Sequence, residues 1–166
     1  MVIVGLGNPG EKYQGTRHNA GEIILRRLAK EFGDGDFLIE KKRMVEIAYG
    51  KIGKNSATFL FPTTFMNDSG KALKHFVVSK KEIADLVVIH DELDLPIGKL
   101  KFSFGKNSGG HRGVESIIKS LKSKEFFRVR LGISPATPSG KLKKPSGEKA
   151  VLSFILGKLK PSEEAI

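Results

Sequence analysis

The chain has 166 residues, of which 39% are hydrophobic, and it contains no cysteine. This length suits about one domain with a proper core, and the composition is that of a globular rather than a disordered protein. The lack of cysteine excludes a disulfide framework and cysteine-based zinc or redox sites. No apolar run approaches the roughly 20 residues that span a bilayer, and no basic segment precedes the apolar N-terminus as in a signal peptide. We therefore expect a cytoplasmic protein that does not associate with membranes.

The first half of the chain alternates between strand and helix patterns. Met1–Val4 is a short apolar run that ends at a glycine, which is typical of a buried strand. Apolar residues at helical spacing predict a helix over Gly21–Phe32. Alternating apolar and polar residues predict strands over Met44–Ile52 and Ala57–Phe61. A residue suited to capping begins the next predicted helix, Ser69–Val78.

The second half continues the alternation. Leu86–Ile89 predicts another buried strand, and Leu100–Phe104 carries apolar residues on one face of a strand. Gly113–Leu121 follows a glycine-rich loop and predicts a helix, Phe127–Ile133 predicts a strand, and Lys149–Leu156 predicts a short helix or turn. Because strands and helices alternate, we predict one α/β domain over residues 1–166, with a mixed, twisted sheet and helices on both faces.

The net charge of +11 is concentrated in one part of the chain. Residues 99–149 hold 13 of the 29 Lys and Arg residues but only three acids, whereas residues 1–98 are near balance. This pattern favours a polyanion such as nucleic acid docking on one side, although a solvated face that keeps the protein soluble is the alternative. Residues 134–148 are rich in Pro, Ser, Gly and Lys, which predicts a mobile basic loop.

Three polar, turn-forming segments follow apolar runs: the stretch that ends at Gly21 and contains His18, then Pro62–Gly70, then His90–Pro96. Ligands of α/β sheets gather beyond the carboxyl ends of strands, so we expect these segments to meet in one cleft. A histidine there can act as a base near pH 7 when a carboxylate orients it, and Asp91 is the natural candidate. The alternative is a histidine that only bonds a nearby carbonyl. The chain lacks cysteine and a Gly-x-Ser-x-Gly segment, so the pair indicates water activation rather than a covalent intermediate.

The glycine-rich segment Gly5–Gly10 formally matches the dinucleotide-binding pattern. Pro9 and further loop-like residues intervene before the next helix, and no strand ends in an acid about 20 residues on. A tight turn is therefore favoured over a nicotinamide site, and a nucleotide-dependent oxidoreductase is kept as a weaker alternative. We also expect no metal, because the candidate ligands lack the spacing of known sites. These candidates are His18, His90, Asp91 and His111.

Two other loops contain side chains that suit substrate binding. Asn67 precedes a predicted helix, so it either caps that helix or offers its amide to a carbonyl, with Met66 as an apolar wall. The loop Lys106–Gly113 also precedes a helix. Its glycines permit close backbone approach and the helix N-terminus favours an anion, with His111 and Arg112 as further donors. A flexible glycine connection is the alternative.

Four blocks of this sequence resemble the bacterial-type peptidyl-tRNA hydrolases, in the same order and spacing and over essentially the whole chain. They are Val4–Gly10 with Tyr13 and Thr16–Asn19, Pro62–Gly70, His90–Pro96, and Gly109–His111 with Gly113. The resemblance implies a monomeric α/β hydrolase without a cofactor. Its substrate would be peptidyl-tRNA, and it would cleave the ester between the peptide and the terminal ribose, which frees the tRNA for reuse.

The resemblance also implies roles for single residues. His18 corresponds to the general base acting on water, and Asp91 to the carboxylate that orients it. Asn8 and Asn67 correspond to amides that position the substrate. Tyr13, Met66 and His111 correspond to residues that line the cleft or contact the substrate, and Arg130 to a basic residue facing tRNA. Together with the charge pattern, this places further tRNA contacts at Lys106, Lys141, Lys143 and Lys144.

The chain departs from the family pattern in three places. Arg112 stands where the family usually has Asn; it cannot accept a hydrogen bond from water, but it can bind a phosphate or a developing oxyanion. Residues 134–148 form a longer and more basic loop than usual. The family usually continues past Lys160–Ile166 into a further helix, so we expect the C-terminal helix to be cut short. Arg112 keeps open a second function, that of a catalytically silent RNA-binding module on the same fold.

Overall fold

The computed structural model describes residues 1–164 and contains one seven-stranded sheet with the strand order β2-β3-β4-β1-β5-β7-β6. Strand β1 pairs in parallel with β4 and β5, and β5 pairs in parallel with β7. The outer pairs β2–β3, β3–β4 and β6–β7 are antiparallel, so the sheet is mixed. The strands are β1 (Val2–Gly5), β2 (Leu38–Glu40), β3 (Val45–Ile52), β4 (Asn55–Pro62), β5 (Leu86–Pro96), β6 (Leu100–Phe104) and β7 (Phe127–Ser134).

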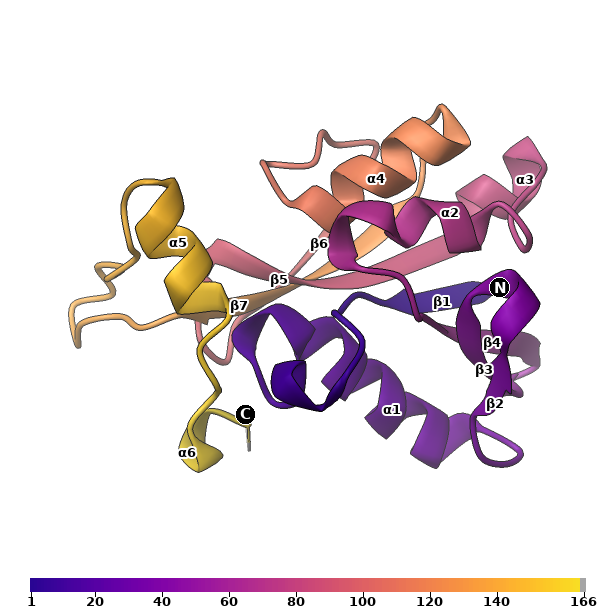
Figure 1. Ribbon diagram of the computed structural model, residues 1–166, viewed down its shortest axis with the longest axis horizontal. Coiled ribbons are helices and arrows are strands. Elements are labelled where there is room, and N and C mark those ends of the chain that lie inside the picture. Colours follow the sequence, from indigo (N-terminus) through magenta and orange to yellow (C-terminus); the bar gives the residue numbers. More distant parts are fainter. Residues whose placement is uncertain (165–166) are drawn as a thin grey trace.

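Helices cover both faces of this sheet (Figure 1), as the sequence predicted. Helix α1 (Ala20–Phe32) covers one face, and α2 (Ser69–Leu73), α3 (Lys80–Ala84) and α4 (Arg112–Leu121) lie on the other. Helix α5 (Glu148–Ile155) lies beyond the carboxyl ends of β5 and β7, and α6 (Pro161–Glu164) follows it. The predicted α/β architecture is therefore confirmed.

Two apolar cores lie on opposite faces of the sheet. Leu25 of α1 packs with Phe59 and Ile89 on one face, and all three side chains are essentially inaccessible to water. Leu73 and Ile117 pack with Val88 on the other face. Burying a large apolar side chain contributes about 1.5–3 kcal/mol, so these cores fix the sheet and helices that position the loops at its end.

Two glycines let α1 start directly over the ends of β1 and β5. A Cβ on Gly21 would lie 2.3 Å from the backbone oxygen of Ile89, and a Cβ on Gly5 would lie 2.5 Å from the backbone oxygen of Gly21. No side chain fits into such approaches, which explains these glycines without any nucleotide. In addition, Leu6 donates its N–H to Ile89 and accepts the N–H of Glu22. The residues just before α1 are thereby held at the carboxyl ends of the parallel strands.

Some predicted boundaries were wrong. The strand predicted over Leu86–Ile89 continues to Pro96, because β7 keeps pairing with it through Glu92. The helix predicted over Ser69–Val78 ends at Leu73, and a second helix starts at a capping box formed by Ser79 and Glu82. The three-residue edge strand β2 and this short α3 were not predicted, because neither is long enough to produce a periodic pattern.

The segment before α5 folds back on itself. Ala136 bridges to Leu142, and the backbone N–H of Thr137 donates to the backbone oxygen of Lys141, which closes a short turn. The mobility expected for residues 134–148 stays a prediction. At the end of the chain α6 spans four residues, and residues 165–166 of the predicted domain lie outside the described part. Over residues 1–164, no helix has both the length and the apolar character needed to cross a membrane.

Candidate active site

A cleft of about 580 Å³ lies at the carboxyl ends of the parallel strands and is lined by the loops there and by α5. The three polar segments singled out in the sequence all contribute to it, and so does the glycine loop before α4. Most of the predicted site residues line this cleft. They are Asn8, Tyr13, His18, Met66, Asn67, Asp91, His111, Arg112 and Lys144. The other predicted basic residues, Lys106, Arg130, Lys141 and Lys143, are not among its lining residues.

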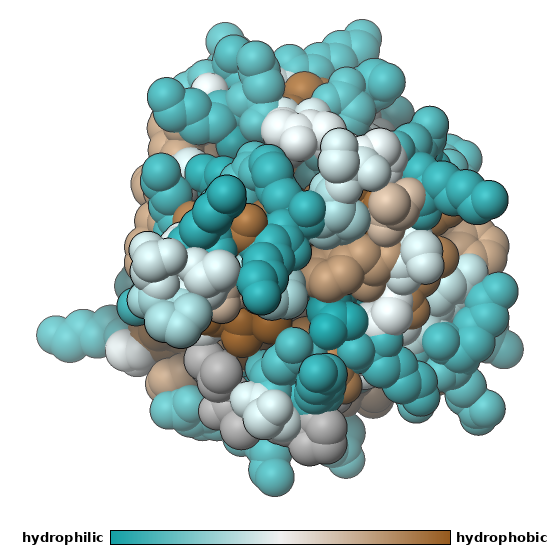
Figure 2. Space-filling view, turned by 90° about the vertical axis from the view of Figure 1, so that its left-hand side faces the viewer, coloured by the Kyte–Doolittle hydropathy of each residue, from teal (hydrophilic) through white to brown (hydrophobic). Residues whose placement is uncertain are grey.

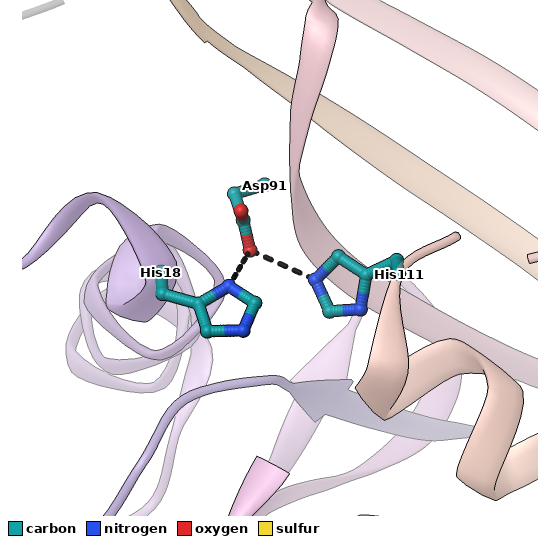
Figure 3. A group of neighbouring side chains, drawn as sticks. All are labelled: His18, Asp91 and His111. Carbon is teal, nitrogen blue, oxygen red and sulfur yellow. Dashed lines mark hydrogen bonds and ion pairs between the residues drawn. The ribbon is translucent and has the colours of Figure 1, made fainter. Parts of the chain in front are cut away.

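At the centre of the cleft two imidazoles share one carboxylate oxygen (Figure 3). Nδ1 of His18 lies 2.9 Å from Oδ1 of Asp91, and Nε2 of His111 lies 2.8 Å from the same oxygen. His18 comes from the 3₁₀ turn before α1, Asp91 from β5 and His111 from the residue before α4. The fold thus joins three segments that are distant in sequence.

The hydrogen-bond partners fix the protonation of both rings. An ionised carboxylate can only accept, so His18 donates through Nδ1–H and His111 through Nε2–H. Nδ1 of His111 also accepts the backbone N–H groups of Gly113 and Val114, at 3.2 and 3.3 Å. His111 therefore has both nitrogens engaged, whereas Nε2 of His18 is the unprotonated nitrogen of the neutral ring. No described residue bonds this nitrogen, and His18 lines the cleft.

Asp91 is ionised in this arrangement. Its burial on its own would raise the pKa of the carboxyl, but His18 and His111 together lower it further, so that the pKa lies far below its usual range. Hydrogen bonds to a charged group are worth about 1.5–3 kcal/mol each. A permanent negative charge beside His18 stabilises the imidazolium that would form when Nε2 takes a proton.

His90 forms a neutral wall behind this cluster. It is fully buried, donates through Nδ1 to the backbone oxygen of Asp91 at 2.8 Å, and contacts the edge of the His111 ring at a centroid distance of 4.7 Å. Burial of the ring, together with the neighbouring His111 and Arg128, lowers the pKa of His90 to about 3. Its Nε2 has no partner among the described residues. His90 is therefore neutral at pH 7 and holds the peptide that carries Asp91.

Asn8 is held by a reciprocal amide contact with Asn19. The Asn8 N–H donates to Oδ1 of Asn19, and Nδ2 of Asn19 donates back to the Asn8 carbonyl, both at 2.9 Å. Oδ1 of Asn8 then accepts the backbone N–H of Met66, also at 2.9 Å. No described acceptor takes the Nδ2 of Asn8, so this donor is available on the cleft wall.

The remaining predicted contacts surround this centre. Asn67 is exposed at the cleft, and its side chain has no hydrogen-bond partner among residues 1–164. Met66 is buried beside Gly113, where a Cβ would lie 2.4 Å from its sulfur. Tyr13 stacks edge-to-face with Phe65 at 6.4 Å. These residues offer one free amide and two apolar walls to a bound chain.

Two ion pairs cross the mouth of the cleft. Nη2 of Arg112 lies 2.7 Å from Oε1 of Glu148, the first residue of α5. Lys144 pairs with Asp94 of β5. The two pairs join the start of α5 to α4, and the segment before α5 to β5.

The other predicted basic residues do not line the cleft. Arg130 pairs with Glu92 at 2.9 Å and is partly buried. Lys106, Lys141 and Lys143 are exposed, and within the described residues their side chains form no ion pair. Their contact with tRNA stays a prediction.

His18, Asp91 and His111 are close enough to be considered as metal ligands, since their candidate atoms all lie within 4.8 Å of one another. The bonding of His111 opposes this. A metal on Nε2 would move the proton to Nδ1, where two backbone N–H groups already point. The cluster is therefore suited to hydrogen bonding and proton transfer.

The sequence interpretation missed three contributors. Asn19 holds Asn8, His90 supports Asp91, and Glu148 engages Arg112. Asn19 had one available signal, since it directly follows His18 in a polar loop. His90 was considered only as a metal ligand, and nothing local to Glu148 indicates a partner 36 residues away.

Comparisons with known proteins show which family this chain belongs to. The sequence model of the family described as "Peptidyl-tRNA hydrolase" matches residues 2–166. A peptidyl-tRNA hydrolase of Prochlorococcus marinus is 41% identical over all of this chain and 79% of its own length, and one of Histophilus somni is 42% identical over 98% and 79%. The crystal structure of peptidyl-tRNA hydrolase from Acinetobacter baumannii superposes with a TM-score of 0.85 at 32% identity, covering 99% of this chain and 79% of that one. This chain therefore belongs to the peptidyl-tRNA hydrolase family.

Proposed function

We propose that this protein hydrolyses the ester bond of peptidyl-tRNA with a water molecule activated by His18, releasing the peptide and free tRNA. The observation that carries the proposal is the His18–Asp91 pair at the centre of a cleft, with Nε2 of His18 unbonded within the described residues. The family supplies the substrate, and this geometry supplies a means of cleaving it.

The reaction follows from the protonation of the cluster. Nε2 of His18 takes a proton from water as the water oxygen bonds to the ester carbonyl carbon. Asp91 stabilises the imidazolium through Nδ1–H, and His18 then returns the proton to the ribose oxygen as the carbon–oxygen ester bond breaks. No group from outside the chain is consumed except water.

The carbonyl oxygen becomes negative in this step and needs donors. The free Nδ2 groups of Asn8 and Asn67 line the same cleft as His18 and suit that task. Asn8 is the more rigid of the two, because Met66 and Asn19 both hold it. Met66 and Tyr13 offer apolar contacts to the peptide.

The ester-release assay tests this function. Wild-type protein is expected to release a labelled N-blocked amino acid from its tRNA. His18→Ala should reduce release by about 10²–10⁴-fold or more, as for loss of a general base, and Asn67→Ala by about 10²–10³-fold, as for loss of an oxyanion donor. His75→Asn is the control, because His75 is exposed and does not line the cleft.

Circular dichroism should show that His18→Ala and Asn67→Ala remain folded. Release by His18→Ala at the wild-type rate would refute the assignment of the base. Salt-sensitive RNA binding by the wild-type protein without any ester release would instead favour the silent RNA-binding module.

We further infer that the protein acts as a monomer in the cytoplasm. A monomer suits a cleft to which β5, α4 and α5 of one chain all contribute. Light scattering during size-exclusion chromatography tests the monomer, and fractionation of cells tests the location.

A further inference from the structure

Arg112 lies at the mouth of the cleft, one residue after the imidazole that holds Asp91. Its guanidinium pairs with Glu148 at 2.7 Å, and the side chains are 62% and 83% exposed. Helices α4 and α5 are therefore joined across the cleft mouth by two groups that remain largely in water.

An ion pair of this kind is easily exchanged. Exposed pairs contribute about 0–1 kcal/mol, so replacing one partner by another anion costs little. The planar guanidinium keeps its charge and matches two phosphate oxygens at once, which a lysine ammonium does not. A phosphate could therefore bind Arg112 at the position that the Glu148 carboxylate occupies.

The position of Arg112 relative to His18 indicates which phosphate this is, provided that the proposed function holds. The ring centroids of His18 and His111 are 5.0 Å apart, and Arg112 follows His111 in the chain. With the ester at His18, the anionic group of the substrate nearest to the reacting carbonyl is the phosphodiester on the 5′ side of the terminal ribose.

The other candidate donors at the mouth are less suited to that phosphodiester. Lys144 is held by Asp94 on β5. In the first turn of α4, the N–H groups of Gly113 and Val114 already donate to Nδ1 of His111. The end of the molecule that carries α5 presents many hydrophilic residues with apolar patches between them (Figure 2).

We propose that Arg112 binds the phosphodiester between the last two nucleotides of tRNA, and that Glu148 holds the guanidinium at the cleft until the tRNA displaces it. Arg112 then acts as a specificity residue for the intact 3′ end, and Glu148 as its competitor. Binding at this position brings the ester toward His18.

The test measures binding of deacylated tRNA, which needs no catalysis, using full-length tRNA and tRNA lacking its terminal nucleotide. Arg112→Gln should weaken binding of full-length tRNA by about 5–10-fold and lower the slope of log K against log salt by about 0.7, the value for one single-stranded phosphate. The truncated tRNA should bind Arg112→Gln and wild type within twofold. Glu148→Gln should tighten binding of full-length tRNA by about twofold or more, because the competing carboxylate is removed.

Lys119→Gln is the matched control, since Lys119 lies on the same helix, is exposed and pairs with Glu115. An Arg112→Gln variant that binds full-length tRNA like wild type, or that weakens both tRNAs equally, would overturn the phosphate assignment. If Glu148→Gln binds full-length tRNA as wild type does, the proposal that Glu148 competes with the phosphate for Arg112 is wrong. These results are separable from the ester-release assay: wild-type protein that releases no peptide refutes the proposed function, whatever the binding shows.

Discussion

His90 gives a stability prediction that can be worked out from its burial. Its pKa is lowered from 6.5 to about 3 in the folded protein, because the fully buried ring cannot be charged at low cost. In the unfolded chain the ring takes up a proton below pH 6.5. The unfolded state therefore binds more protons between these two values, and stability falls as the pH falls through this window.

The magnitude follows from the size of the shift. One pKa unit corresponds to about 1.4 kcal/mol, so a shift of this size is worth about 5 kcal/mol in total, of which about 3 kcal/mol is lost between pH 6.5 and 4.5. The lowered pKa of Asp91 acts in a different range: its contribution is present above the unfolded value near 3.8 and is lost only below it. A measurement that stops at pH 4.5 therefore isolates His90 from Asp91.

Urea unfolding of wild type and His90→Asn at pH 7.0 and pH 4.5 measures this contribution. His90→Asn is less stable at pH 7.0, since the ring no longer packs against His111, but it should lose about 3 kcal/mol less than wild type on acidification. His75→Asn, which removes an exposed ring, should lose as much as wild type. Equal losses in wild type and His90→Asn would refute the view that burial holds His90 neutral.

Two further substitutions test the site and the surface. Asp91→Asn should fold, because its amide is nearly isosteric, but kcat should fall by about 10²-fold or more, since no charge remains to stabilise the His18 imidazolium; a wild-type kcat in the ester-release assay would contradict this. Replacing the three lysines of the turn before α5 by Gln should weaken tRNA binding and flatten its salt dependence, by up to about 0.9 in slope for each phosphate that is no longer neutralised. An unchanged slope would show that these lysines do not reach phosphate, and Lys122→Gln, on an exposed residue at the end of α4, is the control. The three lysines are Lys141, Lys143 and Lys144.

Much of the fold could be predicted from local sequence patterns, and the errors of the prediction are local too. Strand β1 was predicted because it is a short apolar run that ends at a glycine, and helix α1 because its apolar residues recur at helical spacing. β5 was predicted too short, since its second half carries polar side chains that face the cleft while its backbone still pairs with β7. The polar end of this strand was therefore predicted as a loop, because the sequence pattern indicates which side chains are buried and not which backbone segments pair.

The contacts in the candidate site could likewise be predicted only in part. The pairing of His18 with Asp91 across 73 residues could be predicted, because carboxyl ends of parallel strands meet at one edge of the sheet. The contact of His111 with Asp91 could not, since it depends on where the glycine loop leaves β6 and enters α4. The partners of Arg112 and Lys144 likewise depend on how the turn before α5 folds, for which the sequence offers no periodic signal.

The shared oxygen of Asp91 explains why His18, rather than His111, would serve as the base. Both rings donate to Oδ1, at 2.9 and 2.8 Å, so distance does not distinguish them. They differ at their second nitrogens: that of His111 accepts two N–H groups at the start of α4, whereas that of His18 has no bond to any described residue. A proton from water can therefore be taken up by His18 without breaking a helix cap. His111 keeps Asp91 fixed and ionised while this happens, which makes it a positioning residue for the reaction as well as a wall of the cleft.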